Sequence, residues 1–264
     1  MRFDVMTLFP EWFEPFRSAG VSRRAFSLGL LELHCWNPRD WAQGAYRRVD
    51  DRPFGGGPGM VMMAEPLWCC LQAIRAQRGD QAPVVLFSPA GHRLDHAAAV
   101  RWTAGEVAVL ICGRYEGVDQ RFIDACVDEQ ISLGDFVLSG GEIAALALLD
   151  ATVRLLPGVL HTADSHVEDS FNPGLDGLLD SPHYTRPVEW DGPHGPMRVP
   201  EVLQSGHHGQ IELYRRQESL KLTARERPDL LDQARAQKKL SMVDETFLIR
   251  LLAQGTRGPG EGSG

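Results

Sequence analysis

The sequence predicts an α/β protein with an open parallel sheet, followed by a small helical domain at the C-terminal end. Within the first 160 residues, short apolar runs alternate with amphipathic stretches, and residues 84–87 and 107–111 are apolar at consecutive positions. Such alternation is typical of parallel strands that are buried on both faces by intervening helices. From residue 201 onward only helical patterns remain, which indicates a separate unit.

The elements follow one another in a regular order. Candidate strands cover residues 3–8, 30–35, 83–87, 107–112 and 130–133, and candidate helices cover 65–77, 95–104, 119–127 and 142–156. The last helix is the clearest, because Leu146, Leu149 and Val153 recur at helical spacing. Pro157 and Gly158 then end it.

Four segments divide the chain. We expect a ligand-binding α/β domain over 1–160 and a helical domain over 201–253, with Ser205 as a helix cap. Residues 161–200 are rich in Pro, Gly, Asp, His and Ser and predict an interdomain linker without a core of its own. The glycine-rich tail, 254–264, predicts disorder.

The overall charge excludes a protein that is basic over its whole surface. There are 27 Lys+Arg and 35 Asp+Glu, giving a net charge of −8. A local cationic patch could still bind a polyanion. Five cysteines without a Cys-x-x-Cys spacing indicate a reduced compartment, and neither a signal peptide nor a transmembrane segment is apparent, so we expect a cytoplasmic protein.

Three glycine-bearing turns follow predicted strands, at residues 87–91, 113–117 and 133–142. The carboxyl ends of parallel strands meet at one edge of a sheet, so these turns are expected to converge on one pocket. The alternative is that each is only a tight turn between a strand and a helix. The usual dinucleotide fingerprint is absent, and the glycine-dense segment 50–60 fits a flexible turn as well as a binding loop.

Several charged residues are candidates for chemistry or binding. Arg154, on a largely apolar helix, needs a buried anion or a ligand. Asp169 lies in the linker, where a carboxylate is ordinarily only solvated. In the C-terminal unit, basic residues near Tyr214 favour a patch for a nucleic-acid backbone over a solvated helix face; they are Arg215, Arg216, Lys221, Arg225 and Arg227. The nine histidines have no metal-ligand spacing, so we predict no metal site from them.

Taken together, these motifs resemble the bacterial tRNA (guanine-N1)-methyltransferases that modify guanine 37 of tRNA, a family of SPOUT-class methyltransferases. The resemblance extends over nearly the whole chain before the tail. It is carried by residues 8–10, 49–60, 112–117, 134–135, 137–142, 168–171, 182–187, 205–206 and 217–220.

The resemblance implies a fold and an assembly that spacing alone does not reveal. It implies a SPOUT-class open parallel sheet with a deep trefoil knot whose loops hold S-adenosylmethionine, the methyl donor. It implies a homodimer with each active site at the subunit interface, and a C-terminal domain that grips the tRNA anticodon stem-loop. The family is also associated with Mg²⁺, for which this sequence has no evident carboxylate cluster, and with maintenance of the reading frame in translation.

The resemblance also assigns roles to residues. Asp169 matches the general base and Arg154 the group that stabilises guanine O6. Donor binding is implied for Phe87, Ser88, Pro89, Gly113, Tyr115, Glu116, Leu133, Gly134, Asp135, Phe136, Val137, Leu138, Gly140 and Gly141. Contact with tRNA is implied more weakly for Asp50, Arg52, Ser170, Arg215, Arg216 and Lys221.

The roles implied for Asp169 and Arg154 agree with the chemistry of methyl transfer to guanine N1. Guanine N1 carries a proton at neutral pH, so its methylation needs a positioned base and a donor that stabilises charge on O6. Two other readings stay open. One is a SPOUT methyltransferase acting on ribose or ribosomal RNA, which would need neither the 168–171 motif nor the helical domain. The other is a non-catalytic RNA-binding protein, which would have no use for Asp169 and Arg154.

The chain departs from the family pattern at three places. Ile143 and Ala144 stand where the family usually has Leu-Pro, and the segment 172–181 is a few residues longer than is common. Phe136 replaces a frequent Tyr. We expect these changes to affect loop rigidity and closure and to leave the chemistry intact.

Overall fold

The structure, a computed structural model, describes residues 1–104, 107–160 and 168–255. It consists of two compact units, Met1–Ala163 and Asp164–Gly264, which we describe one at a time. The predicted disordered tail lies outside the described residues from 256 onward, and so does the first part of the predicted linker, 161–167.

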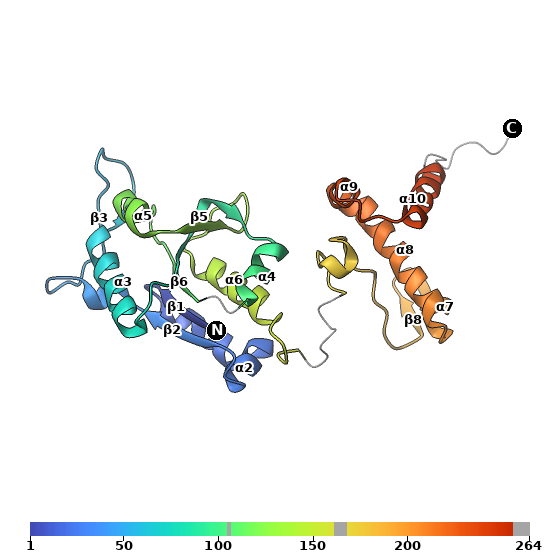
Figure 1. Cartoon of the computed structure of the whole chain (residues 1–264), viewed down its shortest axis with the longest axis horizontal. Helices are drawn as coiled ribbons and strands as arrows, with labels where there is room; N and C mark the ends of the chain where they lie inside the picture. Colours follow the sequence, from blue (N-terminus) through green and yellow to red (C-terminus); the bar gives the residue numbers. More distant parts are fainter. Residues whose placement is uncertain (105–106, 161–167, 256–264) are drawn as a thin grey trace. The chain divides into compact units, whose positions relative to one another are not determined.

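The first unit contains a five-stranded parallel sheet (Figure 1). Its strands are β1 (Arg2–Met6), β2 (Glu32–Trp36), β5 (Val84–Arg93), β6 (Ala108–Ile111) and β7 (Glu129–Ser132), in the order β2-β1-β6-β5-β7. Every neighbouring pair is parallel. The predicted open parallel α/β sheet is therefore confirmed, while the trefoil knot stays a prediction.

Both faces of this sheet are covered by helices (Figure 1). Val85 and Leu110 point into one apolar cluster, and their neighbours Leu86 and Val109 point into the other. The first cluster is closed by η1 (Pro10–Phe13), α1 (Glu14–Ser18), α2 (Gly20–Ser27), α4 (His96–Thr103) and α6 (Glu142–Val153). The second is closed by η2 (Pro38–Trp41), α3 (Ala64–Arg78) and α5 (Gln120–Cys126). Continuous apolar strands are the expected result of burial on both sides.

Two local features shape the carboxyl edge of the sheet. The turn predicted at 87–91 is instead a break within β5, which pairs with β7 up to Phe87 and again from His92. Gly91 permits this, because a Cβ there would lie 2.4 Å from the Gln130 backbone. The glycine-dense segment is the loop of a short antiparallel ribbon between β3 (Asp50–Asp51) and β4 (Val61–Met62).

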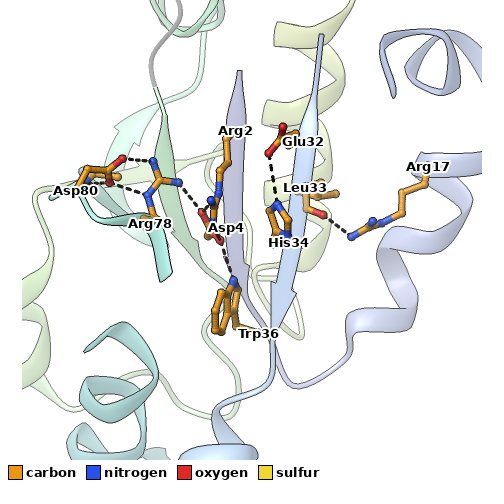
Figure 2. Close-up of polar contacts among 10 residues, drawn as sticks. Arg2, Asp4, Arg17, Glu32, Leu33, His34, Trp36, Arg78 and Asp80 are labelled. Atoms are coloured by element: carbon orange, nitrogen blue, oxygen red, sulfur yellow. Dashed lines mark hydrogen bonds and ion pairs between the residues drawn. The ribbon is translucent and has the colours of Figure 1, made fainter. Parts of the chain in front are cut away.

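A buried ion-pair network lies beside the sheet (Figure 2). The Asp4 carboxylate, fully buried in β1, accepts hydrogen bonds from Arg2 and Arg78 and from the Trp36 indole. Arg78 also pairs with Asp80. Burial by itself raises the pKa of the Asp4 carboxyl, but the hydrogen bonds from Arg2, Arg78 and Trp36 outweigh it and hold that pKa below its ordinary value.

Replacing Asp4 with asparagine is expected to lower the free energy of unfolding by about 3 kcal/mol, because the buried Arg78 then keeps only the half-exposed Asp80 as a carboxylate partner. The lowered pKa means that Asp4 contributes its stability above the unfolded-state value near 3.8 and loses it as the pH falls through the folded-state value. Urea unfolding at pH 7 and at decreasing pH would measure both effects. The control Asp80→Asn, at a half-exposed carboxylate, should cost less than about 1 kcal/mol; equal losses in both variants would contradict a special role for Asp4.

The second unit is mainly helical, as the sequence indicates. It contains α7 (Glu201–Gln204), α8 (His208–Glu226), α9 (Pro228–Ala236) and α10 (Met242–Gly255). Leu220, Leu231 and Leu248 from the three longer helices form its small core. A hairpin of β8 (Glu189–Gly192) and β9 (Gly195–Arg198) and a short 3-10 turn, η3 (Pro173–Leu175), precede the helices.

The segment expected to be a linker is more ordered than its composition indicates. Leu178 is completely buried in the core of the helical unit, and Ser219 and Thr223 of α8 hydrogen-bond the backbone of Leu179. One buried apolar residue and these two hydrogen bonds hold the segment on the helices, and in the sequence a single leucine does not stand out among Pro, Gly and Asp. Ser205 is not the cap of α8: it ends α7, and its hydroxyl accepts from the backbone N–H of His207.

Candidate active site

A cavity of about 340 Å³ lies at the carboxyl edge of the sheet in the first unit. The ends of β5, β6 and β7 and the turns that follow them form its wall. Of the residues predicted to bind the donor, all except Gly134 and Asp135 line it; these are Phe87, Ser88, Pro89, Gly113, Tyr115, Glu116, Leu133, Phe136, Val137, Leu138, Gly140 and Gly141. The structure therefore brings together three turns that lie far apart in the sequence.

Backbone contacts hold two of these turns against each other. The N–H of Gly141 donates to the Gly113 carbonyl at 3.0 Å, and Arg114 and Gly140 form an isolated antiparallel bridge. A Cβ at Gly141 would lie 2.7 Å from the Cα of Cys112, so only glycine permits this approach. A glycine-lined wall of this kind suits a flat, polar ligand that needs close contact with the backbone.

The base of the glycine-dense ribbon loop contacts Glu116, a residue that lines the same cavity. Gly59 has a φ of +78°, and a Cβ there would collide with the Glu116 side chain at 2.3 Å. The N–H of Glu116 donates to the Met60 carbonyl at 2.9 Å. The loop is thus packed at its base on a cavity wall, whereas its tip residue Phe54 is fully exposed.

Tyr115 connects the cavity to a predicted tRNA contact. It has a φ of +60°, and its hydroxyl accepts a hydrogen bond from Arg39 at 3.3 Å. Burial is the largest cause of the raised pKa of Tyr115, followed by its hydrogen bond to Asp50. Asp50 therefore contacts a residue that lines the cavity. Arg52, two positions further along the chain, is exposed.

Two predicted donor residues lie elsewhere, and several lining residues were not predicted. Gly134 serves a turn closed by Ser132, and the almost fully exposed Asp135 pairs with Arg93 at 3.4 Å. The additional lining residues are Leu86, Arg114, Gly117, Val118, Gln120, Ile123, Ile131, Ser132, Ser139 and Ala144. Arg114 and Ser139 lie within the motifs 112–117 and 137–142, next to residues predicted to bind the donor. That proximity in the sequence could have indicated that they line the cavity too.

Arg154 caps the C-terminal end of α6, where its N–H donates to the Asp150 carbonyl at 3.2 Å. Its side chain is partly exposed. Because α6 begins at the Gly140–Gly141 turn, the same helix carries a cavity wall at one end and Arg154 at the other.

In the second unit, Asp169 begins a hydrogen-bonded turn. Its carbonyl accepts from Asn172 at 3.1 Å, and Phe171 has a φ of +72°. The Phe171 N–H donates to the Leu178 carbonyl at 2.9 Å, and the Ser170 hydroxyl accepts from the Asp180 N–H at 2.9 Å. These bonds fix the backbone that follows Asp169, and Ser170 has a structural hydrogen bond in addition to its predicted contact with tRNA.

The predicted basic patch is paired with acids. Arg215 lies 3.7 Å from Glu168, and Lys221 lies 3.2 Å from Glu218. Both are half-exposed, so solvent screens these pairs and phosphates can compete for the cations. Arg216 differs, because it is largely buried between Asp176 at 2.8 Å and Asp244 at 3.0 Å. It therefore stabilises the unit itself.

Comparison with known proteins agrees with this arrangement. The sheet and its carboxyl-edge cavity define an α/β protein with a ligand pocket, and residues 1–233 match the family described as tRNA (Guanine-1)-methyltransferase TrmD. A tRNA (guanine-N(1)-)-methyltransferase of Albidiferax ferrireducens is 66% identical over 248 residues, covering 94% of this chain and 98% of that protein. Proteins of the same name from Paracidovorax citrulli and Bordetella parapertussis are 64% identical over 255 residues (95% and 98% of the two chains) and 58% identical over 258 residues (96% and 99%).

The chain belongs to the tRNA (guanine-N1)-methyltransferase family, which is of the SPOUT class. It is thus a methyltransferase whose substrate is a guanine of tRNA. This excludes the non-catalytic RNA-binding protein and the ribose or ribosomal RNA enzyme considered above. No helix within the described residues is long and apolar enough to cross a membrane.

Proposed function

We propose that the protein transfers the methyl group of S-adenosylmethionine to N1 of guanine 37, beside the anticodon, and so helps to maintain the reading frame. The observation that carries the donor assignment is the cavity at the carboxyl edge of the sheet, which is lined by nearly all residues predicted to bind the donor. Its glycines bring backbone N–H and C=O groups close to a bound molecule, and its apolar side chains can cover an adenine ring.

In the proposed reaction the methyl donor, Asp169 and Arg154 each have one role. Bound S-adenosylmethionine supplies a methyl group on a positively charged sulfur. Asp169 accepts the proton that leaves guanine N1, and the nitrogen lone pair then forms the new bond to carbon as the carbon–sulfur bond breaks. Arg154 donates to O6, where negative charge develops. The hydrogen-bonded turn that begins at Asp169 supports this role, because a base must be held within hydrogen-bond reach of its proton.

We propose that the protein acts as a homodimer, in which each active site lies at the subunit interface and takes residues from both subunits, and that it acts in the cytoplasm. The C-terminal unit would hold the anticodon stem-loop, with Arg215 and Lys221 as phosphate contacts. Within the described residues, no three His, Cys, Asp or Glu side chains gather as metal ligands.

A transfer assay with labelled S-adenosylmethionine tests the proposal. Two tRNA transcripts that differ only in guanine or adenine at position 37 would be compared. Label is expected in the guanine transcript alone. Equal incorporation into both transcripts would contradict methylation at guanine 37, and no incorporation into either would contradict the use of this donor.

The paired cations predict a modest dependence of tRNA affinity on salt. We expect the slope of log K against log salt to correspond to roughly three to five released phosphate contacts. Arg215→Ala and Lys221→Ala should each reduce that slope by about one. Fluorescence titration of tRNA at several salt concentrations measures it. The control Arg235→Ala removes an equal charge, from a residue bonded to Glu245, and should leave the slope unchanged; equal slopes in all four proteins would contradict a patch centred on Arg215.

A further inference from the structure

An ion pair at the edge of the cavity has no role in the proposed reaction. The guanidinium of Arg114 lies 2.9 Å from a carboxylate oxygen of Glu142, with the two side chains 14% and 1% exposed. A second guanidinium nitrogen donates to the Ser139 carbonyl at 3.2 Å. The guanidinium also lies over the ring of Phe9, 4.4 Å from its centroid.

The other oxygen of the Glu142 carboxylate accepts a hydrogen bond as well. The Thr7 hydroxyl donates to Glu142 at 2.8 Å, and both residues are buried. Thr7 directly follows β1, Arg114 follows β6, and Glu142 is the first residue of α6. The pair therefore ties together three segments that are distant in sequence at the carboxyl edge of the sheet.

The position of Arg114 also depends on the neighbouring glycine turn. A Cβ at Gly140 would lie 2.2 Å from Nε of Arg114, so the arginine side chain passes directly over this glycine. Gly140 and Arg114 both line the cavity, and Glu142 does not. A shift of the guanidinium would therefore move or free the turn that forms one wall.

We propose that Arg114 and Glu142 are positioning residues for the methyl donor: they fix the distance between the turn 113–117 and the turn 139–141, and thereby the shape of the donor pocket. The proposal rests on the proposed use of S-adenosylmethionine. Burial of an ion pair has a large desolvation cost and is weak evidence for a gain in stability. A role in holding the pocket accounts for its presence beside the cavity.

Donor binding and thermal stability, measured separately, test the proposal. Calorimetric titration of S-adenosylmethionine, without RNA, gives the dissociation constant, and a melting curve gives Tm. Glu142→Gln and Arg114→Lys are each expected to weaken donor binding about tenfold or more, since both loosen the bonds that hold the turns. The control Arg2→Met removes one partner of the buried Asp4, away from the cavity, and should lower Tm without changing the dissociation constant.

The double variant Arg114→Met with Glu142→Gln separates positioning from stability. It leaves no uncompensated buried charge, so its Tm should recover relative to Glu142→Gln, which leaves the Arg114 cation without its carboxylate, while donor binding stays weak. It also provides a folded protein if a single variant fails to fold. Recovery of donor affinity together with Tm would overturn the positioning role, and so would unchanged affinity in the single variants. Failure of the wild-type protein to bind the donor would instead overturn the proposed function, and the positioning role with it.

Discussion

Replacing Asp169 with asparagine is expected to slow methyl transfer by about 10²- to 10⁴-fold, the usual contribution of a positioned general base. Asparagine keeps the shape of the side chain but cannot accept the guanine N1 proton. The turn is held by backbone bonds of Asp169, Phe171 and Asn172, so the fold of the unit should not change. Single-turnover rates at saturating tRNA and donor measure the loss.

Asp180→Asn is the matched control. Asp180 is also a partly exposed carboxylate in the same segment, but it bonds Ser181 and His183 within its own turn. Its replacement should leave the single-turnover rate within about twofold of wild type, because no catalytic proton transfer depends on it. Equal losses at both positions would indicate a general disturbance of the segment and contradict the assignment of the base.

Gly141→Ala should abolish donor binding or unfold the first unit. The added methyl group would lie 2.7 Å from the Cα of Cys112 and 3.2 Å from the backbone nitrogen of Gly113. Both are backbone atoms in a sheet edge, so no flexible side chain can move aside to relieve the clash. Overpacking of this kind costs about 1–3 kcal/mol, and here the strain falls on the contact that holds two cavity walls together. Calorimetric titration and melting curves report the two outcomes.

Gly209→Ala is the corresponding control, at a helical glycine of α8 with nothing within 4 Å of an added Cβ. It should raise stability by less than about 1 kcal/mol, the value for a helix interior, because Gly209 is the second residue of α8, and it should leave donor binding unchanged. Normal donor affinity in Gly141→Ala would contradict the close packing of the two turns.

The framework of the first unit could be predicted because its signals are local and repeated. Apolar residues at every position of β6 indicate burial on both faces, and glycine turns after consecutive strands indicate a pocket. Knowledge of parallel pairing then suffices to place residues such as Ser88, Gly113 and Leu138 near one another. The roles of individual site residues came from the family resemblance, because the spacing of residues does not indicate them.

Other features depend on partners that a sequence does not identify. Arg216 lies in a basic stretch that predicts contact with phosphates. Its guanidinium instead forms ion pairs with Asp176 and Asp244, which are distant in the sequence. Asp135 is next to pocket residues in sequence, but the turn closed by Ser132 directs it to Arg93 at the surface. The order of residues 171–180 comes from burial of Leu178 in the helical core and from the bonds of Leu179 and Asp176 to α8. The net charge of −8 likewise conceals a surface whose cations are mostly paired.

The methylated nucleoside itself provides the most direct test of the proposed reaction. The protein would be incubated with S-adenosylmethionine and a transcript carrying guanine 37, and the RNA would be digested and analysed by mass spectrometry against nucleoside standards. We predict 1-methylguanosine, mapped to position 37 and strongly reduced with Asp169→Asn at the same reaction time. Methylation on the ribose, on another guanine atom or at another position would contradict the proposed reaction.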